Sequence, residues 1–268
     1  MRSGSEVRGS GQVNVHPTAI VHPDAELGED VEIGPYSIIE GTVKIGARTR
    51  IAARVSVEGN TIIGEDNEIF SGAIIGSRTQ DKKFKGGVSY LRIGDRNKIR
   101  EYVTINPGTK EGTETAIGND NLLMAYCHVA HDCIIYNQTI LANAATLAGH
   151  VIVEDRAIIG GLSAVHQFVR IGKMALVGGC SKVVQDVPSF MIADGHPARV
   201  FGVNAVGLDR GGFSKEEKSV LRKAFKTIFR SGLTLKLALS NLEKEFPSSP
   251  SLTVLMDFLK SSERGVCR

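Results

Sequence analysis

Aliphatic residues recur at every sixth position along most of the chain. Three series, over residues 15–75, 93–105 and 117–183, together hold 26 such positions, and each position carries valine, isoleucine or leucine. A period of six fits neither the 3.6-residue repeat of an amphipathic helix nor the two-residue alternation of a simple strand. It is typical of a solenoid whose short strands turn a corner every six residues.

Small side chains accompany these aliphatic positions. The fourth residue after each is usually small or short-branched, and the residue directly after it is often glycine. We expect these residues where the backbone bends. Three hexads would make one triangular coil of 18 residues, and coils would stack about 4.8 Å apart, as hydrogen-bonded strands do. A Val/Ile-rich β-sandwich is the alternative, but its strands would vary in spacing.

The period is interrupted twice and then stops. Residues 77–92 and 109–116 are polar and glycine-rich, so we expect loops there that project from the coils. The solenoid would occupy residues 13–190. A flexible segment of residues 1–12 would precede it, and a connecting segment of residues 191–212 would follow.

Residues 213–268 have helical periodicity instead. Ser214 and Glu217 have the spacing of a capping box at a helix N-terminus, and apolar residues follow at helical intervals. Residues 233–246 and 252–260 supply two further helical segments. The sequence therefore predicts a C-terminal helical domain.

Composition supports this picture and excludes several classes of protein. Thirty glycines, no tryptophan and 6% aromatic residues indicate a core of small and branched aliphatic side chains. The net charge of +3 is too small for a nucleic-acid coat, so no nucleic acid is expected as a partner. No run of about 18 apolar residues occurs, so no transmembrane segment is expected. The four cysteines lack metal-binding spacing and are expected to be reduced thiols.

Three histidines fall on nearly the same edge of successive coils. Divided by 18, the numbers of His131, His150 and His166 leave remainders of 5, 6 and 4, and His128 lies slightly behind them. Any one of them could simply be solvated at a bend. Together they suggest proton transfer, because the ordinary pKa of histidine lies near neutrality and His131 has a carboxylate neighbour in Asp132.

A metal site is the rival interpretation of this edge. Three histidines could bind zinc, as in the γ-class carbonic anhydrases, which share this type of solenoid. Zinc needs its nitrogen ligands about 2.1 Å away, whereas His131 and His166 would be two coils apart. A site shared between subunits would escape that objection. We nevertheless expect no metal and no cofactor.

A series of motifs resembles the UDP-N-acetylglucosamine O-acyltransferases, hexapeptide-repeat enzymes of lipid A synthesis. The likeness spans nearly the whole chain, from Val15 to Gly265. It implies a left-handed parallel β-helix of hexapeptide repeats with a C-terminal α-helical domain. The motifs are His128–Cys133, Leu141–His150, Ile158–Gly161, Ala164–Phe168, Gly178–Ser181, Gln185–Pro188 and Phe201–Asn204.

The resemblance implies a reaction and roles for particular residues. An (R)-3-hydroxyacyl group would pass from acyl carrier protein to the 3-hydroxyl of UDP-N-acetylglucosamine. His131 would be the general base, Asp132 its supporting carboxylate and Gly149 the source of an N–H for the oxyanion. Gly179 would leave room for a long acyl chain. The other implied substrate contacts are Asp81, Lys83, His128, His150, His166, Gln167, Asn204 and Arg210.

Three positions depart from the family pattern. Asn106 and Pro197 stand where relatives commonly have histidine, and Gly211 stands where a second basic residue often follows the arginine. Weaker nucleotide binding is therefore expected. None of the three is the base, so the reaction class is unaffected.

The resemblance also implies partners and a location. Family members are homotrimers with active sites between subunits. The charge of the basic helices of residues 213–268 separately suggests docking of the acidic carrier protein, with a solvated helix face as the alternative. The cytoplasm is the expected location. A mitochondrion or other organelle is the alternative, if residues 1–12 follow a removed transit peptide.

Two other functions remain open. The first is a different hexapeptide acyltransferase, which acylates an amino group or uses acetyl-CoA. The second is a non-catalytic hexapeptide scaffold, which would have no reason to keep His131 beside Asp132, Gly149 and Gln167.

Overall fold

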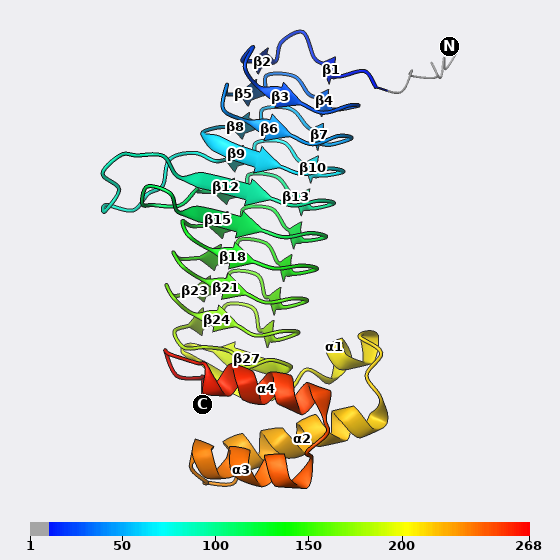
Figure 1. Ribbon diagram of the computed structural model, residues 1–268, viewed down its shortest axis with the longest axis vertical. Helices are drawn as coiled ribbons and strands as arrows, with labels where there is room; N and C mark the ends of the chain where they lie inside the picture. Colours follow the sequence, from blue (N-terminus) through cyan, green and yellow to red (C-terminus); the bar gives the residue numbers. More distant parts are fainter. Residues whose placement is uncertain (1–10) are drawn as a thin grey trace. The chain divides into compact units, whose positions relative to one another are not determined.

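The computed structural model describes residues 11–268, so most of the predicted flexible segment 1–12 lies outside the described residues. Short strands stack in three sheets, and the strands between residues 14 and 193 pair in parallel (Figure 1). The chain divides into two compact units. The first holds residues up to 126 together with 130–132, and the second holds residues 127–129 and 133–268.

The first unit is built of coils of three strands each. Residues 18 apart pair across neighbouring coils, as Asn14 does with Glu32 and Glu32 with Arg50, which confirms the predicted coil length. Its strands are β1 (Asn14–Val15), β2 (Ile20–Val21), β3 (Glu26–Leu27), β4 (Glu32–Ile33), β5 (Ile38–Ile39), β6 (Lys44–Ile45), β7 (Arg50–Ile51), β8 (Ser56–Val57), β9 (Asn60–Ile63), β10 (Glu68–Ile69), β11 (Ile74–Ile75), β12 (Tyr90–Ile93), β13 (Lys98–Ile99), β14 (Thr104–Ile105), β15 (Glu114–Ile117) and β16 (Leu122–Leu123).

The second unit continues with coils of the same length, and Ile140 pairs with Ile158 as Ile158 does with Leu176. Its strands are β17 (His128–Val129), β18 (Ile134–Ile135), β19 (Ile140–Leu141), β20 (Thr146–Leu147), β21 (Ile152–Val153), β22 (Ile158–Ile159), β23 (Ala164–Val165), β24 (Arg170–Ile171), β25 (Leu176–Val177), β26 (Lys182–Val183), β27 (Met191–Gly195) and β28 (Ala198–Val203). Four helices follow, α1 (Ala205–Arg210), α2 (Lys215–Phe229), α3 (Leu235–Glu245) and α4 (Pro250–Lys260).

The aliphatic hexad residues form the interior of the coils. Of the 26 positions, 23 are buried, and the three exceptions are Val15, Val21 and Leu27. These three belong to β1, β2 and β3, the strands at the ends of their sheets, which pair on one side only. Their side chains therefore lack the covering coil that buries the others.

The bends lie at a different position from the one predicted. In most hexads the residue three after the inward aliphatic has a left-handed backbone, with φ of 60° at Tyr36 and 58° at Arg48, and it is rarely glycine. The glycines directly after the aliphatics allow close approach instead. A Cβ at Gly28 or Gly46 would come within 2.6 Å of the next coil's backbone. Each non-glycine left-handed residue costs about 1 kcal/mol, which the coil hydrogen bonds must offset.

The two predicted loops are shorter than expected. Residues 90–92 and 114–116 belong to β12 and β15, because four-residue strands pair across both insertions. Pairing of Glu68 with Lys98 and of Lys98 with Leu122 shows that the insertions add 12 and 6 residues to their coils. The longer insertion projects from the coils beside β9 and β12 (Figure 1).

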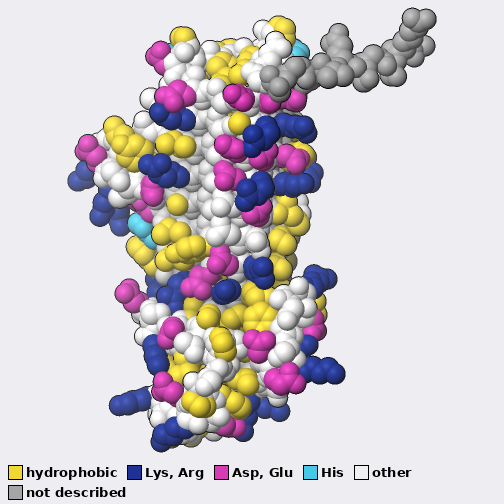
Figure 2. All heavy atoms as spheres, turned by 45° about the vertical axis from the view of Figure 1, so that its right-hand side comes forward, with side chains coloured by type: hydrophobic (Ala, Val, Ile, Leu, Met, Phe, Trp, Pro, Cys, Tyr) yellow, Lys and Arg dark blue, Asp and Glu magenta, His cyan; other side chains and the backbone are white. Residues whose placement is uncertain are grey.

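Charged side chains in the first unit pair between neighbouring coils. Arg48 contacts Asp66 at 2.7 Å, and Arg96 contacts Asp120 at 2.8 Å. Figure 2 shows basic and acidic side chains interspersed on the upper part of the face that it draws. These exposed pairs contribute little stability, about 0–1 kcal/mol each, but they keep this edge hydrophilic.

The C-terminal region contains more structure than the sequence predicted. The supposed connection, residues 191–212, holds the antiparallel pair of β27 and β28 and the short helix α1. The capping box of Ser214 and Glu217 is confirmed at the start of α2. The domain boundaries taken from the sequence stay a prediction. No helix within residues 11–268 is long and apolar enough to cross a membrane.

Cysteine accessibility gives a test of this fold. Cys127, Cys133 and Cys267 are buried and Cys180 is exposed, and burial raises the pKa of the Cys267 thiol to about 11. Because the thiolate is the reactive form, we expect a thiol reagent to label one cysteine per native chain, at Cys180. All four should react after denaturation. Rapid labelling of Cys267 in the native chain would contradict the fold.

Candidate active site

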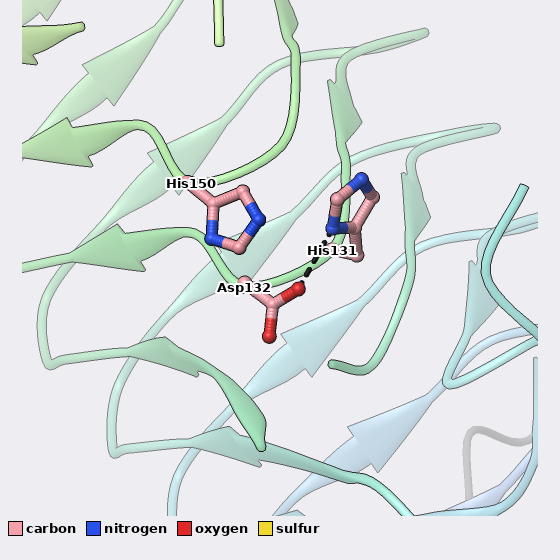
Figure 3. A group of neighbouring side chains, drawn as sticks. All are labelled: His131, Asp132 and His150. Atoms are coloured by element: carbon pink, nitrogen blue, oxygen red, sulfur yellow. Dashed lines mark hydrogen bonds and ion pairs between the residues drawn. The ribbon is translucent and has the colours of Figure 1, made fainter. Parts of the chain in front are cut away.

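His131 and Asp132 form a close pair directly after strand β17. The Nδ1 atom of His131 lies 2.7 Å from Oδ2 of Asp132, and the two side chains are 14% and 9% exposed (Figure 3). A carboxylate only accepts hydrogen bonds, so in the neutral imidazole Nδ1 carries the proton and Nε2 carries the lone pair. This tautomer makes Nε2 the atom able to take a proton from a ligand.

The first unit holds Asp132 in place through its backbone and its carboxylate. The Asp132 N–H donates to Oγ1 of Thr115 at 2.8 Å, and the Thr109 N–H donates to Oδ2 of Asp132 at 3.2 Å. Asp132 is also one of the left-handed corner residues, with φ of 58°. The carboxylate is therefore fixed before any ligand binds, and it orients the imidazole of His131.

A second carboxylate approaches His131 from the longer insertion. Oδ2 of Asp81 lies 3.6 Å from Nε2 of His131, and the Asp81 side chain is 19% exposed. Oδ1 of Asp81 accepts the Lys83 N–H, and the Asp81 N–H donates to Oγ1 of Thr79. An imidazolium formed at His131 would thus lie between two carboxylates, which stabilises its charge. Lys83 is exposed, and it contacts Asp81 through its backbone N–H.

The insertion that carries Asp81 is tied to the shorter one. Oγ1 of Thr79 lies 3.3 Å from Oγ1 of Thr109, and the Asn106 amide donates to the Ser77 carbonyl at 2.9 Å. Asn106, which departs from the family pattern, therefore has a structural role, because its side chain closes the base of the loop.

The second unit carries the remaining residues of the histidine edge. His128 pairs with Thr146 in the sheet, and the ring of His150 stacks on Phe168 with centroids 4.5 Å apart. His150 has the left-handed corner backbone, with φ of 61°. The carbonyl of Gly149 accepts the Phe168 N–H at 3.2 Å. The proposed oxyanion contact of the Gly149 N–H stays a prediction.

His166, Gln167 and Gly179 are all exposed in the second unit. Nδ1 of His166 lies 3.2 Å from the Gln167 carbonyl and 3.4 Å from Nη2 of Arg264. A Cβ at Gly179 would meet the Gly161 carbonyl oxygen at 3.4 Å, which is ordinary contact. A larger side chain at Gly179 would therefore not disturb the coil.

Asn204 has a structural role that the sequence did not reveal. Its side chain caps α1, accepting the Gly207 N–H at 3.0 Å, and donates to the Met174 carbonyl at 2.9 Å. The residue is 3% exposed, so both polar atoms serve the fold. Arg210, in the last turn of α1, is exposed. A diphosphate contact for either residue stays a prediction.

Asp132 accepts hydrogen bonds from His131 and from the Thr109 N–H, so a metal bound to this carboxylate would have to replace those contacts. The absence of a metal from the reaction stays a prediction.

Two contacts of the site could not be found by sequence reasoning. The resemblance implies a sugar contact for Asp81, whereas its approach to His131 depends on how an aperiodic insertion folds. Thr109 and Thr115 hold Asp132 in place. Apart from lying in the second interruption of the period, they have no feature in the sequence that predicts this contact. The six-residue period predicts the positions of residues in the regular hexads only, and not of residues in the insertions.

Comparison with known proteins identifies the family. The family model for the second domain of UDP-N-acetylglucosamine O-acyltransferase matches residues 186–267. An acyl-[acyl-carrier-protein]–UDP-N-acetylglucosamine O-acyltransferase from Thermodesulfovibrio yellowstonii is 50% identical over 255 residues, covering 95% of this chain and 99% of the relative.

Solved structures agree with this relationship. LpxA from Acinetobacter baumannii is 45% identical with a TM-score of 0.91, covering 95% of this chain and 99% of its own. LpxA from Bacteroides fragilis, a UDP-N-acetylglucosamine acyltransferase, is 43% identical with a TM-score of 0.92, covering 94% and 99%. The predicted left-handed parallel β-helix is thereby confirmed. The chain belongs to the family of acyl-[acyl-carrier-protein]–UDP-N-acetylglucosamine O-acyltransferases.

Proposed function

We propose that this protein transfers an (R)-3-hydroxyacyl group from acyl carrier protein to the 3-hydroxyl of UDP-N-acetylglucosamine, the first step of lipid A synthesis, with His131 as general base. The observation that carries the proposal is the His131–Asp132 pair, 2.7 Å apart and little exposed, in a chain that is 50% identical to an enzyme named for this reaction.

The proposed chemistry uses one proton and one acyl group. Nε2 of His131 takes the proton of the sugar hydroxyl as its oxygen attacks the thioester carbonyl. The Gly149 N–H would stabilise the oxyanion that forms. When the intermediate collapses, the C–S bond breaks and the imidazolium returns the proton to the leaving thiolate. Asp132 and Asp81 support the positive charge of His131 in between.

Donor choice separates this proposal from its alternatives. Purified protein should acylate UDP-N-acetylglucosamine with a 3-hydroxyacyl thioester of acyl carrier protein, and should give no product with acetyl-CoA. Turnover with acetyl-CoA alone would favour a different hexapeptide acyltransferase. No turnover with either donor would favour a scaffold.

A homotrimer is part of the proposal, and the outer face of one sheet supports it. In the first unit the outward residues of β2, β5, β8, β11 and β14 are uncharged, and Ile20, Ile38 and Ile74 are 65%, 45% and 40% exposed. The outward residues of β4, β7, β10 and β13 all carry charge. An uncharged sheet face beside a charged one is typical of a surface that packs against another copy.

Charge placed on this face should weaken the trimer. We expect Ile38→Asp to shift the protein toward monomers in sedimentation velocity, because it would bury an unpaired carboxylate at the interface. Arg50→Asp, a charge change on the neighbouring sheet, is the matched control and should leave the assembly unchanged. If both variants and the wild type have the same sedimentation coefficient, the sheet that contains Ile38 is not the interface.

Carrier-protein docking and location complete the proposal. Helix α2 carries Arg222, Lys223 and Lys226, and such a basic helix suits an acidic partner. Lys223 already contacts Glu245 at 3.4 Å, so part of this charge is balanced. The cytoplasm is the proposed location, with an organelle as the alternative if residues 1–12 follow a removed transit peptide.

A further inference from the structure

The last residues of the chain bring an arginine beside His166, one of the expected substrate contacts. After α4 ends at Lys260, the tail of residues 261–268 returns to the final coil, where Nη2 of Arg264 lies 3.4 Å from Nδ1 of His166. The same atom lies 3.5 Å from the Val184 carbonyl. Arginine has no acceptor atom, so it donates in both contacts. Both distances are long for hydrogen bonds.

The tail is fixed by the buried carboxylate of Asp186. Ser262 Oγ donates to Oδ2 of Asp186 at 2.7 Å, while the backbone of Asp186 exchanges hydrogen bonds with Gly265 and Cys267. Asp186 is 3% exposed, and Cys267 is 1% exposed. Arg264 therefore extends from an anchored segment, although it is itself exposed. The fold therefore sets the position of its backbone, and the side chain reaches His166 from there.

The charge of Arg264 is not balanced within the protein. Within residues 11–268 no carboxylate lies within ion-pair distance of its guanidinium, whereas Arg48, Arg92, Arg96 and Arg100 all have acidic partners. Most of its five N–H donors are left for a ligand. A guanidinium prefers anions that accept two parallel hydrogen bonds, above all phosphate and carboxylate.

We propose that Arg264 is a substrate-binding residue that contacts a phosphate group beside His166. This inference rests on the proposed function, since both of its substrates carry phosphate. One source is the diphosphate of UDP-N-acetylglucosamine. The other is the phosphodiester of the phosphopantetheine arm that carries the acyl group on acyl carrier protein.

Steady-state kinetics of two variants test this assignment. In Arg264→Gln the charge is lost, and the KM for one of the two substrates should rise about tenfold, the effect expected of one charged hydrogen bond, with kcat changed less than about threefold. Arg264→Lys keeps the charge but lacks the paired N–H donors of the guanidinium, and its KM should lie between those of wild type and Arg264→Gln. Arg268→Gln, in the same tail, is the matched control and should behave as wild type.

The substrate whose KM rises identifies the phosphate. A higher KM for UDP-N-acetylglucosamine, with weaker binding of UDP alone by calorimetry, assigns the diphosphate. A higher KM for the acyl donor, with UDP binding unchanged, assigns the phosphopantetheine arm. If wild type is active and Arg264→Gln keeps both KM values, or loses only kcat, the inference is overturned and the proposed function stands. A wild type without turnover overturns both.

Discussion

Replacement of His131 by alanine is expected to lower kcat by about 10³-fold, within the range lost when a general base is removed. Nε2 of His131 is the atom left unprotonated by the contact of Nδ1 with Asp132, and a sugar hydroxyl is scarcely ionised at neutral pH. The side chain lies outside the aliphatic interior and is 14% exposed, so the melting temperature should change little. Turnover of a fixed acyl donor and a thermal melt measure both effects.

The N-terminal coils offer a matched control for this variant. His22 and Asp24 also form a histidine–aspartate pair, but their atoms are 3.7 Å apart and their side chains are 52% and 81% exposed. His22→Ala should therefore keep wild-type turnover. Near-normal activity of His131→Ala, or loss of its folded structure, would show that His131 is not the base.

Replacement of Gly179 by methionine is expected to reverse the preference for acyl-chain length. The wild-type glycine leaves space, and a Cβ at this position would lie 3.4 Å from the Gly161 carbonyl oxygen, so the coil tolerates a side chain there. Each methylene that loses its buried site costs about 0.8 kcal/mol, so a donor longer by four methylenes should lose about 10²-fold in kcat/KM. Donors of graded length measure this shift.

A methionine elsewhere controls for nonspecific effects of the substitution. Gly202 lies in β28, where an added Cβ would meet no atom within 4 Å. Gly202→Met should keep the wild-type order of donors. If Gly179→Met keeps that order as well, the acyl chain does not pass Gly179, and the length assignment is wrong.

The coils were predictable because every hexad repeats the same pattern, one buried aliphatic side chain in six residues. One inward aliphatic every six residues is enough to set the strands, and the 18-residue pairing of Asn14 with Glu32 follows from it. The corners were less predictable. Left-handed backbone at residues such as Tyr36 and Arg48 is imposed by the stacked coils, against the preference of those residues.

The C-terminal region lacks the six-residue period, and its structure was harder to predict. β27 and β28 carry no six-residue period, and α1 has only six residues, so neither gave a strong signal. The capping box of α2 was predictable because Ser214 and Glu217 satisfy backbone groups locally, without help from distant residues.

The candidate site also contains residues that the sequence could place and residues that it could not. His131 and Asp132 are neighbours in sequence, and the coil period places them at a corner. Asp81 reaches His131 from an insertion of irregular sequence, and Arg264 reaches His166 from a tail 98 residues later in the chain. Contacts of this kind depend on tertiary folding, which periodicity does not describe.

Identification of the reaction product tests the central proposal most directly. Purified protein is incubated with UDP-N-acetylglucosamine and a 3-hydroxyacyl thioester of acyl carrier protein, and the product is analysed by mass spectrometry and NMR. We expect a nucleotide sugar heavier by one hydroxyacyl group, with an ester on the 3-hydroxyl of glucosamine. An unchanged nucleotide sugar, or acylation at any other position, would contradict the account.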